Sequence, residues 1–101
     1  MQSQQNALSA TEVGARLERA RAIMGLPTQK AMAERLGANV NQYNNWARGA
    51  QMIPVTFAAK LCTYGFSLDY IYRGDLSNLP VRIVALLEER PDTGQLSHAA
   101  S

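Results

Sequence analysis

The sequence predicts an all-α protein: a compact five-helix domain followed by a sixth, C-terminal helix. Apolar residues recur three and four positions apart, which is the spacing of helices that bury one face. Helix-capping residues such as Thr28 and Ser67 precede these segments, and single glycines such as Gly37 and Gly74 follow them. An apolar fraction of 47% over 101 residues is enough for a small helical core without disulfides or a metal.

Three helices are expected before residue 49. The first spans about 10–24, where Ser9 and Glu12 can form a capping box at its start. The second spans 29–36 and the third 40–48, separated by a short turn. The positions expected to face inward are Val13, Leu17, Ala20, Met24, Met32, Ala33, Leu36, Tyr43, Trp46 and Ala47.

Three further helices are expected after residue 53. Pro54 suits the first turn of the fourth and Pro80 that of the sixth, because proline lacks the amide that a helix start leaves unpaired anyway. Residues 81–84 alternate like a strand, but the strong helix formers of 85–90 favour a helix. The expected inward positions are Val55, Ala58, Leu61 and Cys62, then Leu68, Ile71 and Tyr72. The apolar positions of the sixth helix are Val81, Ile83, Val84 and Leu87.

The composition argues against several classes of function. The single histidine, His98, falls in a polar tail, and Cys62 falls on a stripe expected to be buried. No Cys or His residues have metal-ligand spacing, and the glycines stand singly rather than in a phosphate-binding loop. We therefore expect no catalysis, cofactor, metal or small-molecule ligand. No apolar run is long enough for a membrane span, and no leader is apparent, so a soluble cytoplasmic protein is expected.

Charge is distributed unevenly along the chain. Residues 10–68 carry seven Lys and Arg against three Glu, whereas residues 69–101 carry three Arg against five Asp and Glu. Between Arg35 and Leu68 there is no acidic residue. A phosphate-binding surface must lack carboxylates as well as carry cations, so this pattern favours a nucleic-acid partner. A chance imbalance on a solvated surface is the alternative on charge alone.

The central stretch resembles a known DNA-binding family. Its Gln29, Ala33, Gly37, Tyr43, Trp46 and Gly49 resemble the helix-turn-helix of Cro/lambda-repressor-like (Xre-type) domains. Segments 17–29 and 53–74 resemble the flanking helices, so the resemblance covers residues 10 to 74 and implies a lambda-repressor-like fold. Tyr43 departs from the usual β-branched aliphatic residue. Ala47 replaces a common glutamate, which leaves Arg21 to find another partner or to face solvent or phosphate.

The resemblance places the third helix in the DNA major groove and its outward side chains at the base edges. One amide can donate to adenine N7 and accept from its N6 amino group, so four amides predict a preference for A·T pairs. Val40 can contact a thymine methyl group. Asparagine without a partner is the alternative, although asparagine is a poor residue for a helix interior. The expected base contacts are Val40, Asn41, Gln42, Asn44 and Asn45.

Phosphate contacts are expected around the same helix pair. The resemblance implies that Gln29 grips the DNA backbone at the start of the second helix, where backbone amides already favour an anion. The expected phosphate and positioning residues are Gln29, Lys30, Asn39 and Arg48, with Arg35 as a further cation. Tyr43 and Trp46 could instead stack on single-stranded bases, but their spacing favours the core.

These observations predict a regulator of transcription that binds double-stranded DNA, acting as a repressor in association with the nucleoid. Its parts are tails at 1–8 and 91–101, expected to be disordered, a DNA-binding domain at 9–74, and a linker with a C-terminal helix at 75–90. A homodimer would bind a near-palindromic operator with A·T-leaning half-sites. The candidate dimerisation residues are Leu79, Val81, Ile83, Val84 and Leu87.

Two alternatives stay open. The sixth helix can pack back on its own domain rather than form a dimer. The chain can also be an antitoxin-like interaction module that uses this helix and the tail to bind a partner protein while repressing its own promoter, as members of the family do.

Overall fold

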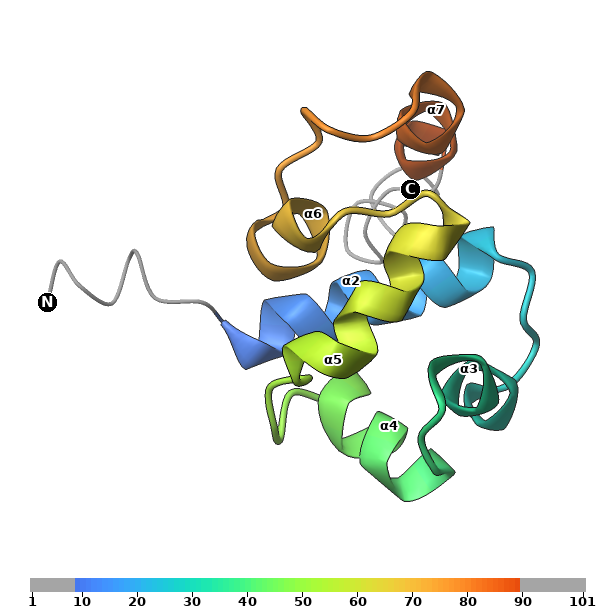
Figure 1. Cartoon of the computed structure of the whole chain (residues 1–101), viewed down its shortest axis with the longest axis vertical. Helices are drawn as coiled ribbons and strands as arrows, with labels where there is room; N and C mark the ends of the chain where they lie inside the picture. The colour runs from blue at the N-terminus through green and yellow to red at the C-terminus, as the bar shows by residue number, and fades with distance from the viewer. Residues whose placement is uncertain (1–8, 90–101) are drawn as a thin grey trace, which may run out of the picture.

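The computed structural model describes residues 9–89, which form six α-helices and one 3-10 helix and contain no strand (Figure 1). The predicted all-α class is therefore confirmed, and the segment with strand-like alternation is helical. The tails predicted at 1–8 and 91–101, with His98, lie outside the described residues. In chain order the elements are α2 (Ala10–Ile23), α3 (Gln29–Leu36), α4 (Val40–Ala47), α5 (Val55–Ala58), η1 (Ala59–Tyr64), α6 (Leu68–Arg73) and α7 (Val81–Glu89).

Side-chain caps begin the helices where the sequence places them. The hydroxyl of Ser9 accepts from the backbone N–H of Glu12 at 3.1 Å, and the hydroxyl of Thr28 accepts from that of Ala31 at 3.1 Å. Ser67 does the same at the start of α6. Each cap satisfies a backbone donor that the first helical turn leaves unpaired, which typically stabilises a protein by about 1 kcal/mol.

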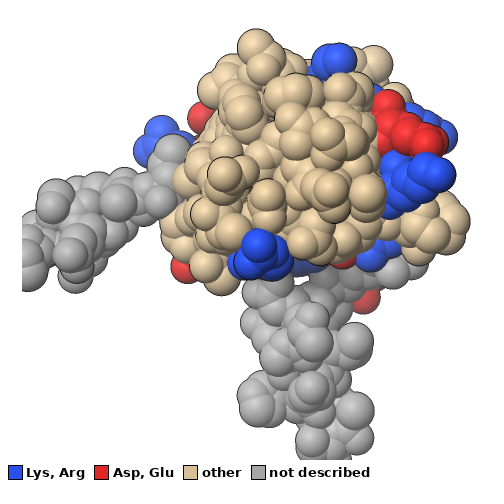
Figure 2. All heavy atoms as spheres, turned by 90° about the horizontal axis from the view of Figure 1, so that it is seen from below, with Lys and Arg blue, Asp and Glu red and all other residues tan. Residues whose placement is uncertain are grey.

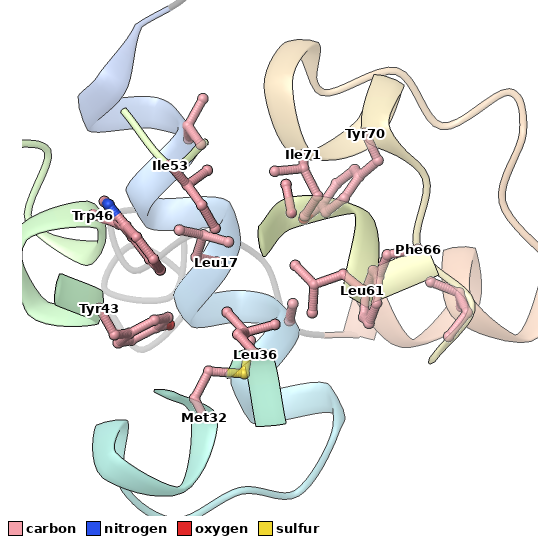
Figure 3. Packing of buried hydrophobic residues seen from close by; sticks show 14 of the residues in the cluster. Leu17, Met32, Leu36, Tyr43, Trp46, Ile53, Leu61, Phe66, Tyr70 and Ile71 are labelled. Atoms are coloured by element: carbon pink, nitrogen blue, oxygen red, sulfur yellow. The ribbon is translucent and has the colours of Figure 1, made fainter. Parts of the chain in front are cut away.

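Helix α2 is the central element of the fold. It runs through the middle of the molecule, with α3 and α4 on one side and α6 and α7 on the other (Figure 1). Leu17, halfway along α2, is fully buried among side chains from these surrounding helices (Figure 3). The core residues are Val13, Leu17, Ala20, Met32, Ala33, Leu36, Tyr43, Trp46, Ile53, Ala58, Leu61, Phe66, Tyr70, Ile71, Leu79, Ile83 and Leu87.

The segment from Val55 to Tyr64 differs from the single α-helix that the sequence predicts. It begins as α5 but continues as the 3-10 helix η1, which has three residues per turn instead of 3.6. Ala58 and Leu61 are buried at this tighter spacing, while Cys62 turns outward and is exposed. Val55, at the first position of α5, is 57% exposed. The expected burial of Val55 and Cys62 is therefore wrong.

Helix α7 packs back on its own domain. Leu79, Ile83 and Leu87 follow one another at intervals of four and are buried in the core. The guanidinium of Arg19 on α2 donates to the Leu87 carbonyl oxygen at 3.1 Å, so the end of α7 is also held by a hydrogen bond. Of the candidate dimerisation residues, Leu79, Ile83 and Leu87 are thus corrected to core positions. Val84 is half-buried, and Val81 is 85% exposed.

No helix within residues 9–89 has the length and apolar character needed to cross a membrane.

Candidate nucleic-acid interface

A short turn joins α3 and α4, and the residues that end the first helix and begin the second determine its geometry. Gly37 ends α3 with a φ of +77°, a left-handed conformation that costs glycine little and other residues more. Asn39 then caps α4, because its side-chain oxygen accepts from the backbone N–H of Gln42 at 2.8 Å. The side-chain oxygen of Gln42 accepts in return from the Asn39 backbone N–H at 3.0 Å. This capping box fixes the start of α4.

The capping box changes what Asn39 and Gln42 can offer to DNA. The Asn39 side-chain oxygen and the Gln42 side-chain oxygen each accept from a backbone N–H, so the side-chain nitrogens of the two residues are the groups left to contact DNA. The spacing Asn39–x–x–Gln42 is itself a capping-box signal, so the return bond from the Asn39 backbone to Gln42 is predictable from the sequence.

The predicted base-contact residues lie on the outward face of α4. Val40 is 41% exposed, Asn41, Gln42 and Asn44 are exposed, and Asn45 is half-buried. Figure 2 views the molecule from the side on which α3 and α4 lie, and this face is largely uncharged, with acidic side chains at its edges only. The α4 face therefore presents hydrogen-bonding groups without carboxylates to repel a phosphate backbone.

Four polar side chains connect the start of α3 with the end of α4. The Asn44 side-chain nitrogen donates to the Gln29 side-chain oxygen at 3.1 Å. Arg48 donates to the side-chain oxygens of Asn44 at 3.2 Å and Asn45 at 2.9 Å. We call Gln29, Asn44, Arg48 and Asn45 the polar relay. It holds two of the predicted base-contact amides in fixed orientations.

Asn41 differs from the amides of the polar relay. Within residues 9–89 its side chain makes no hydrogen bond, and it projects from the first turn of α4. Both its oxygen and its nitrogen are therefore available to a ligand. Asn41 is the α4 amide best suited to a bidentate contact with adenine.

Tyr43 and Trp46 form the inward face of α4. Both rings are buried, at 6.5 Å between centroids and nearly perpendicular, and Trp46 also packs against Phe57 at 5.0 Å. Figure 3 shows both rings directed toward α2 and the core. Neither ring is accessible for stacking on a base, so the core interpretation is the right one.

The Tyr43 hydroxyl and Arg21 share one partner, the carboxylate of Glu18 on α2. Tyr43 donates to Glu18 at 2.6 Å and Arg21 donates to it at 2.7 Å. Arg21 therefore pairs with a carboxylate on its own helix, that of Glu18, and not with a residue at position 47. Tyrosine at position 43 supplies the link to α4 that an aliphatic side chain cannot make.

The electrostatics of this cluster favour an ionised Glu18. Burial raises the pKa of the Glu18 carboxyl, but hydrogen bonds from Arg21 and Tyr43 outweigh burial and hold that pKa below its ordinary value. The nearby side chain of Gln29 lowers the pKa of Glu18 a little further. Burial and the bond to Glu18 raise the pKa of Tyr43, so its hydroxyl stays protonated and donating.

Gly14 lets α2 and α4 approach at backbone distance. A Cβ at this position would overlap the carbonyl oxygens of Trp46 and Ala47 and lie 2.8 Å from the Ala47 carbonyl carbon. The C-terminal end of α4 is therefore seated directly on the α2 backbone. A glycine inside a helix, costly in isolation, was the sequence signal for such a contact.

Two further cations, Lys30 and Arg35, lie on α3. Lys30 is exposed in the first turn of α3, beside Gln29, where a phosphate would also meet the helix N-terminus. Arg35 lies over the Tyr64 ring at 5.7 Å from its centroid, which occupies it within the fold. Within residues 9–89 no three His, Cys, Asp or Glu side chains cluster closely enough to hold a metal ion.

Comparisons with protein-family models, with curated proteins and with solved structures find no significant match to this chain.

Proposed function

We propose that the protein is a sequence-specific regulator of transcription that binds double-stranded DNA through α4. The observation that supports this most is the outward face of α4, where exposed amides and Val40 stand in a stretch of chain that lacks acidic residues. The short helix preceding it, α3, and the tight turn at Gly37 are the arrangement expected of a helix-turn-helix, as the resemblance to the Cro/lambda-repressor-like family also implies.

Base readout is assigned to the first turn of α4 and to the amides behind it. Asn41, whose two polar groups are both available, would pair with adenine, and Val40 would contact a neighbouring thymine methyl group. Asn44 and Asn45 have their oxygens engaged by Arg48 and so would mainly donate to acceptors in the groove. Gln42 would donate through its free nitrogen. The expected preference for A·T pairs in the half-sites therefore depends mainly on Asn41 and Val40, because a donor alone also fits the N7 and O6 of guanine.

Phosphate contacts would fix the position of α4 in the groove without adding sequence information. The candidates are Gln29 and Lys30 at the start of α3 and Arg48 at the end of α4, and both Gln29 and Arg48 adjoin Asn44 on the base-contact face. Asn39 would contribute through its side-chain nitrogen, since its side-chain oxygen serves as the cap and its backbone N–H donates to Gln42. Each phosphate neutralised releases counterions, so the affinity would fall steeply with salt.

A repressor acting as a homodimer is the simplest way for so small a domain to bind a site of useful length. Two copies on a near-palindrome would place their α4 helices in successive major grooves, about 34 Å apart. The buried face of α7 is not available for such a dimer. Val81, 85% exposed on the outer side of α7, remains as a candidate contact between copies.

The proposal is tested by selecting bound duplexes from a randomised DNA pool at near-physiological salt and sequencing them. We expect enrichment of an inverted repeat with A-rich half-sites. Enrichment of a single half-site would keep the α4 assignment and overturn the dimer. Absence of enrichment, with only weak and salt-sensitive binding, would overturn sequence-specific recognition and favour the antitoxin-like interaction module instead.

A further inference from the structure

Arg48 stands at a position from which one side chain reaches two amides of α4. It follows the last residue of that helix, four positions after Asn44 and three after Asn45. Residues three and four apart are neighbours on a helix surface, whereas adjacent residues such as Asn44 and Asn45 point about 100° apart. The Arg48 guanidinium donates from Nε to the Asn44 oxygen at 3.2 Å and from Nη2 to the Asn45 oxygen at 2.9 Å.

The surroundings of Arg48 leave its guanidinium to these amides. No Asp or Glu occurs between Arg35 and Leu68, and within residues 9–89 no carboxylate lies within ion-pair distance of Arg48. A carboxylate there would compete, because an ionised acceptor binds a guanidinium more strongly than an amide oxygen does. The rigid fork of arginine can serve two oxygens at once, and Nη1 stays available to a phosphate.

The bonds to Arg48 set which group each amide can offer to DNA. They direct the oxygens of Asn44 and Asn45 toward the C-terminal end of α4. Asn44 is also held at its nitrogen, which donates to the Gln29 oxygen at 3.1 Å. An amide reads adenine in a bidentate contact only when its oxygen and its nitrogen both face the base. Asn44 and Asn45 are therefore left as donors, which fit the acceptors of guanine and thymine but not the amino group of cytosine.

We propose that Arg48 is a positioning residue for base recognition: by holding the oxygens of Asn44 and Asn45, it makes these two amides select guanine or thymine instead of adenine. The inference rests on the proposed function of α4. It goes beyond a phosphate contact, because a cation that touches only phosphate changes the affinity for all sequences alike.

The first test compares the duplexes selected from a randomised pool by the unmodified protein, Arg48→Met and Lys30→Met. Both side chains are exposed, so neither substitution opens a cavity, and each removes one positive charge from the proposed interface. Of the two, Arg48 is the one that bonds to the α4 amides. We expect Arg48→Met to shift the preference at the base pairs facing Asn44 and Asn45 toward adenine about tenfold. Lys30→Met should weaken binding to every duplex and leave these preferences within about twofold.

Asn45→Ala checks that Arg48 acts through an amide. In this variant the preference should be lost at the one base pair that faces position 45, which identifies that pair. Adding Arg48→Met to Asn45→Ala should then produce no shift toward adenine at the same pair, because the amide on which Arg48 acts is absent. A shift that persists in the double variant would overturn the inference, since Arg48 would then act on the base directly.

A second measurement needs no DNA. The Nε proton of Arg48, bonded to Asn44, should exchange with water several times more slowly than the Nε proton of Arg82, an exposed arginine on α7. Asn44→Ala removes the acceptor and should accelerate the exchange at Arg48 but not at Arg82. NMR spectroscopy of the labelled protein measures both rates. Equal rates at the two arginines, unaltered by Asn44→Ala, would overturn the inference.

The two proposals fail in different ways. If the unmodified protein prefers no duplex, the proposed function fails and this inference falls with it, even where the Arg48 proton exchanges slowly. If the unmodified protein prefers particular duplexes and Arg48→Met selects the same bases, only the role of Arg48 is overturned.

Discussion

Helices α4 and α7 make an instructive pair. They have eight and nine residues, each begins at a valine, and each carries apolar residues at helical spacing. The sequence predicts that α4 faces DNA and leaves α7 either to face a second copy or to pack on its own domain. In the structure α4 buries its aromatic residues and exposes polar ones, whereas α7 buries Ile83 and Leu87, two of the candidate dimerisation residues.

The difference between the two helices lies in what their patterns specify. An apolar stripe predicts that a helix face is covered, but it does not say whether the cover is the same chain or another. A polar face built from asparagine is more informative, because asparagine weakens a helix relative to alanine, lysine or glutamate. The several asparagines on α4 therefore indicate a use for their amides. The apolar stripe of α7, in contrast, is covered by the rest of the same domain.

The largest expected effect tests the core assignment of α7. Ile83→Ala should lower the free energy of unfolding by about 2–5 kcal/mol, because Ile83 is fully buried and the truncation leaves a cavity. Chemical denaturation followed by circular dichroism measures this loss. Val81→Ala on the exposed side of the same helix is the matched control and should change stability by about 0.5 kcal/mol or less. If both variants lower stability only slightly, Ile83 is not a core residue, and α7 does not differ from α4 in the way described.

A second prediction concerns the seating of α4 on α2. Gly14→Ala should destabilise the protein by about 1–3 kcal/mol, because the added Cβ collides with the backbone of Trp46 and Ala47. Helix propensity alone predicts the opposite sign, a gain of about 1 kcal/mol. Thermal and chemical denaturation decide between the two. A more stable Gly14→Ala protein would show that α2 and α4 are not in backbone contact.

A loss of similar size is expected where Tyr43 meets Glu18. Tyr43→Phe should lower the free energy of unfolding by about 1.5–3 kcal/mol, the range for a hydrogen bond to a charged group. Tyr72→Phe offers a matched comparison, since the Tyr72 hydroxyl donates to the neutral Ile53 carbonyl at 2.6 Å and should be worth about 0.5–1.5 kcal/mol. Equal losses in denaturant unfolding would argue that the Glu18 contact is no stronger than a neutral one.

The Glu18 cluster also predicts a pH dependence. Because the folded-state pKa of Glu18 lies below its ordinary value of 4.5, its ionised contacts stabilise the folded protein above that pH and are lost as the pH falls through the folded-state pKa. Glu18→Gln should therefore flatten the decline of stability below pH 4.5, as measured by denaturation at successive pH values. An unchanged acid dependence in the variant would place the responsible carboxyl elsewhere.

The smallest expected effect on stability is on the outer face of α4. Asn41→Ala should leave the free energy of unfolding unchanged or raise it by a few tenths of a kcal/mol (about 0.3–0.6), since alanine is the better helix former. The same variant should lose about tenfold in discrimination against a substituted A·T pair. Asn78→Ala, an exposed amide in the segment before α7, is the control for discrimination only, because its nitrogen donates to Asp69 at 3.3 Å and its loss can itself change stability. Unaltered discrimination in Asn41→Ala would remove this residue from the interface.

Local chemistry explains why much of the fold could be predicted. Caps at Ser9, Thr28, Asn39 and Ser67 act within three residues, so the helix starts followed from the sequence alone. Left-handed glycines such as Gly37 act equally locally. The expected base-contact residues lie on the outward side of α4 for the same reason, because their direction depends on the phase of one short helix.

Longer-range features could not be predicted in this way. The helix changes to 3-10 geometry at Ala59, and this change turns Cys62 outward. No residue type near Ala59 predicts the change. Tyr70 was not expected in the core and is buried, because its ring packs on Phe66 across the turn before α6. The contact of Glu18 with Tyr43 joins positions 25 residues apart, so it required the crossing of α2 and α4 to be known.

The central claim is that α4, and not α7, faces the DNA. The most direct test is a titration of isotopically labelled protein with the selected duplex, monitored by backbone NMR signals. The account predicts that the largest shifts fall at residues 29–30 and 39–48, with those of α7 nearly unchanged. Shifts concentrated on α7, with the amides of α4 unaffected, would contradict it.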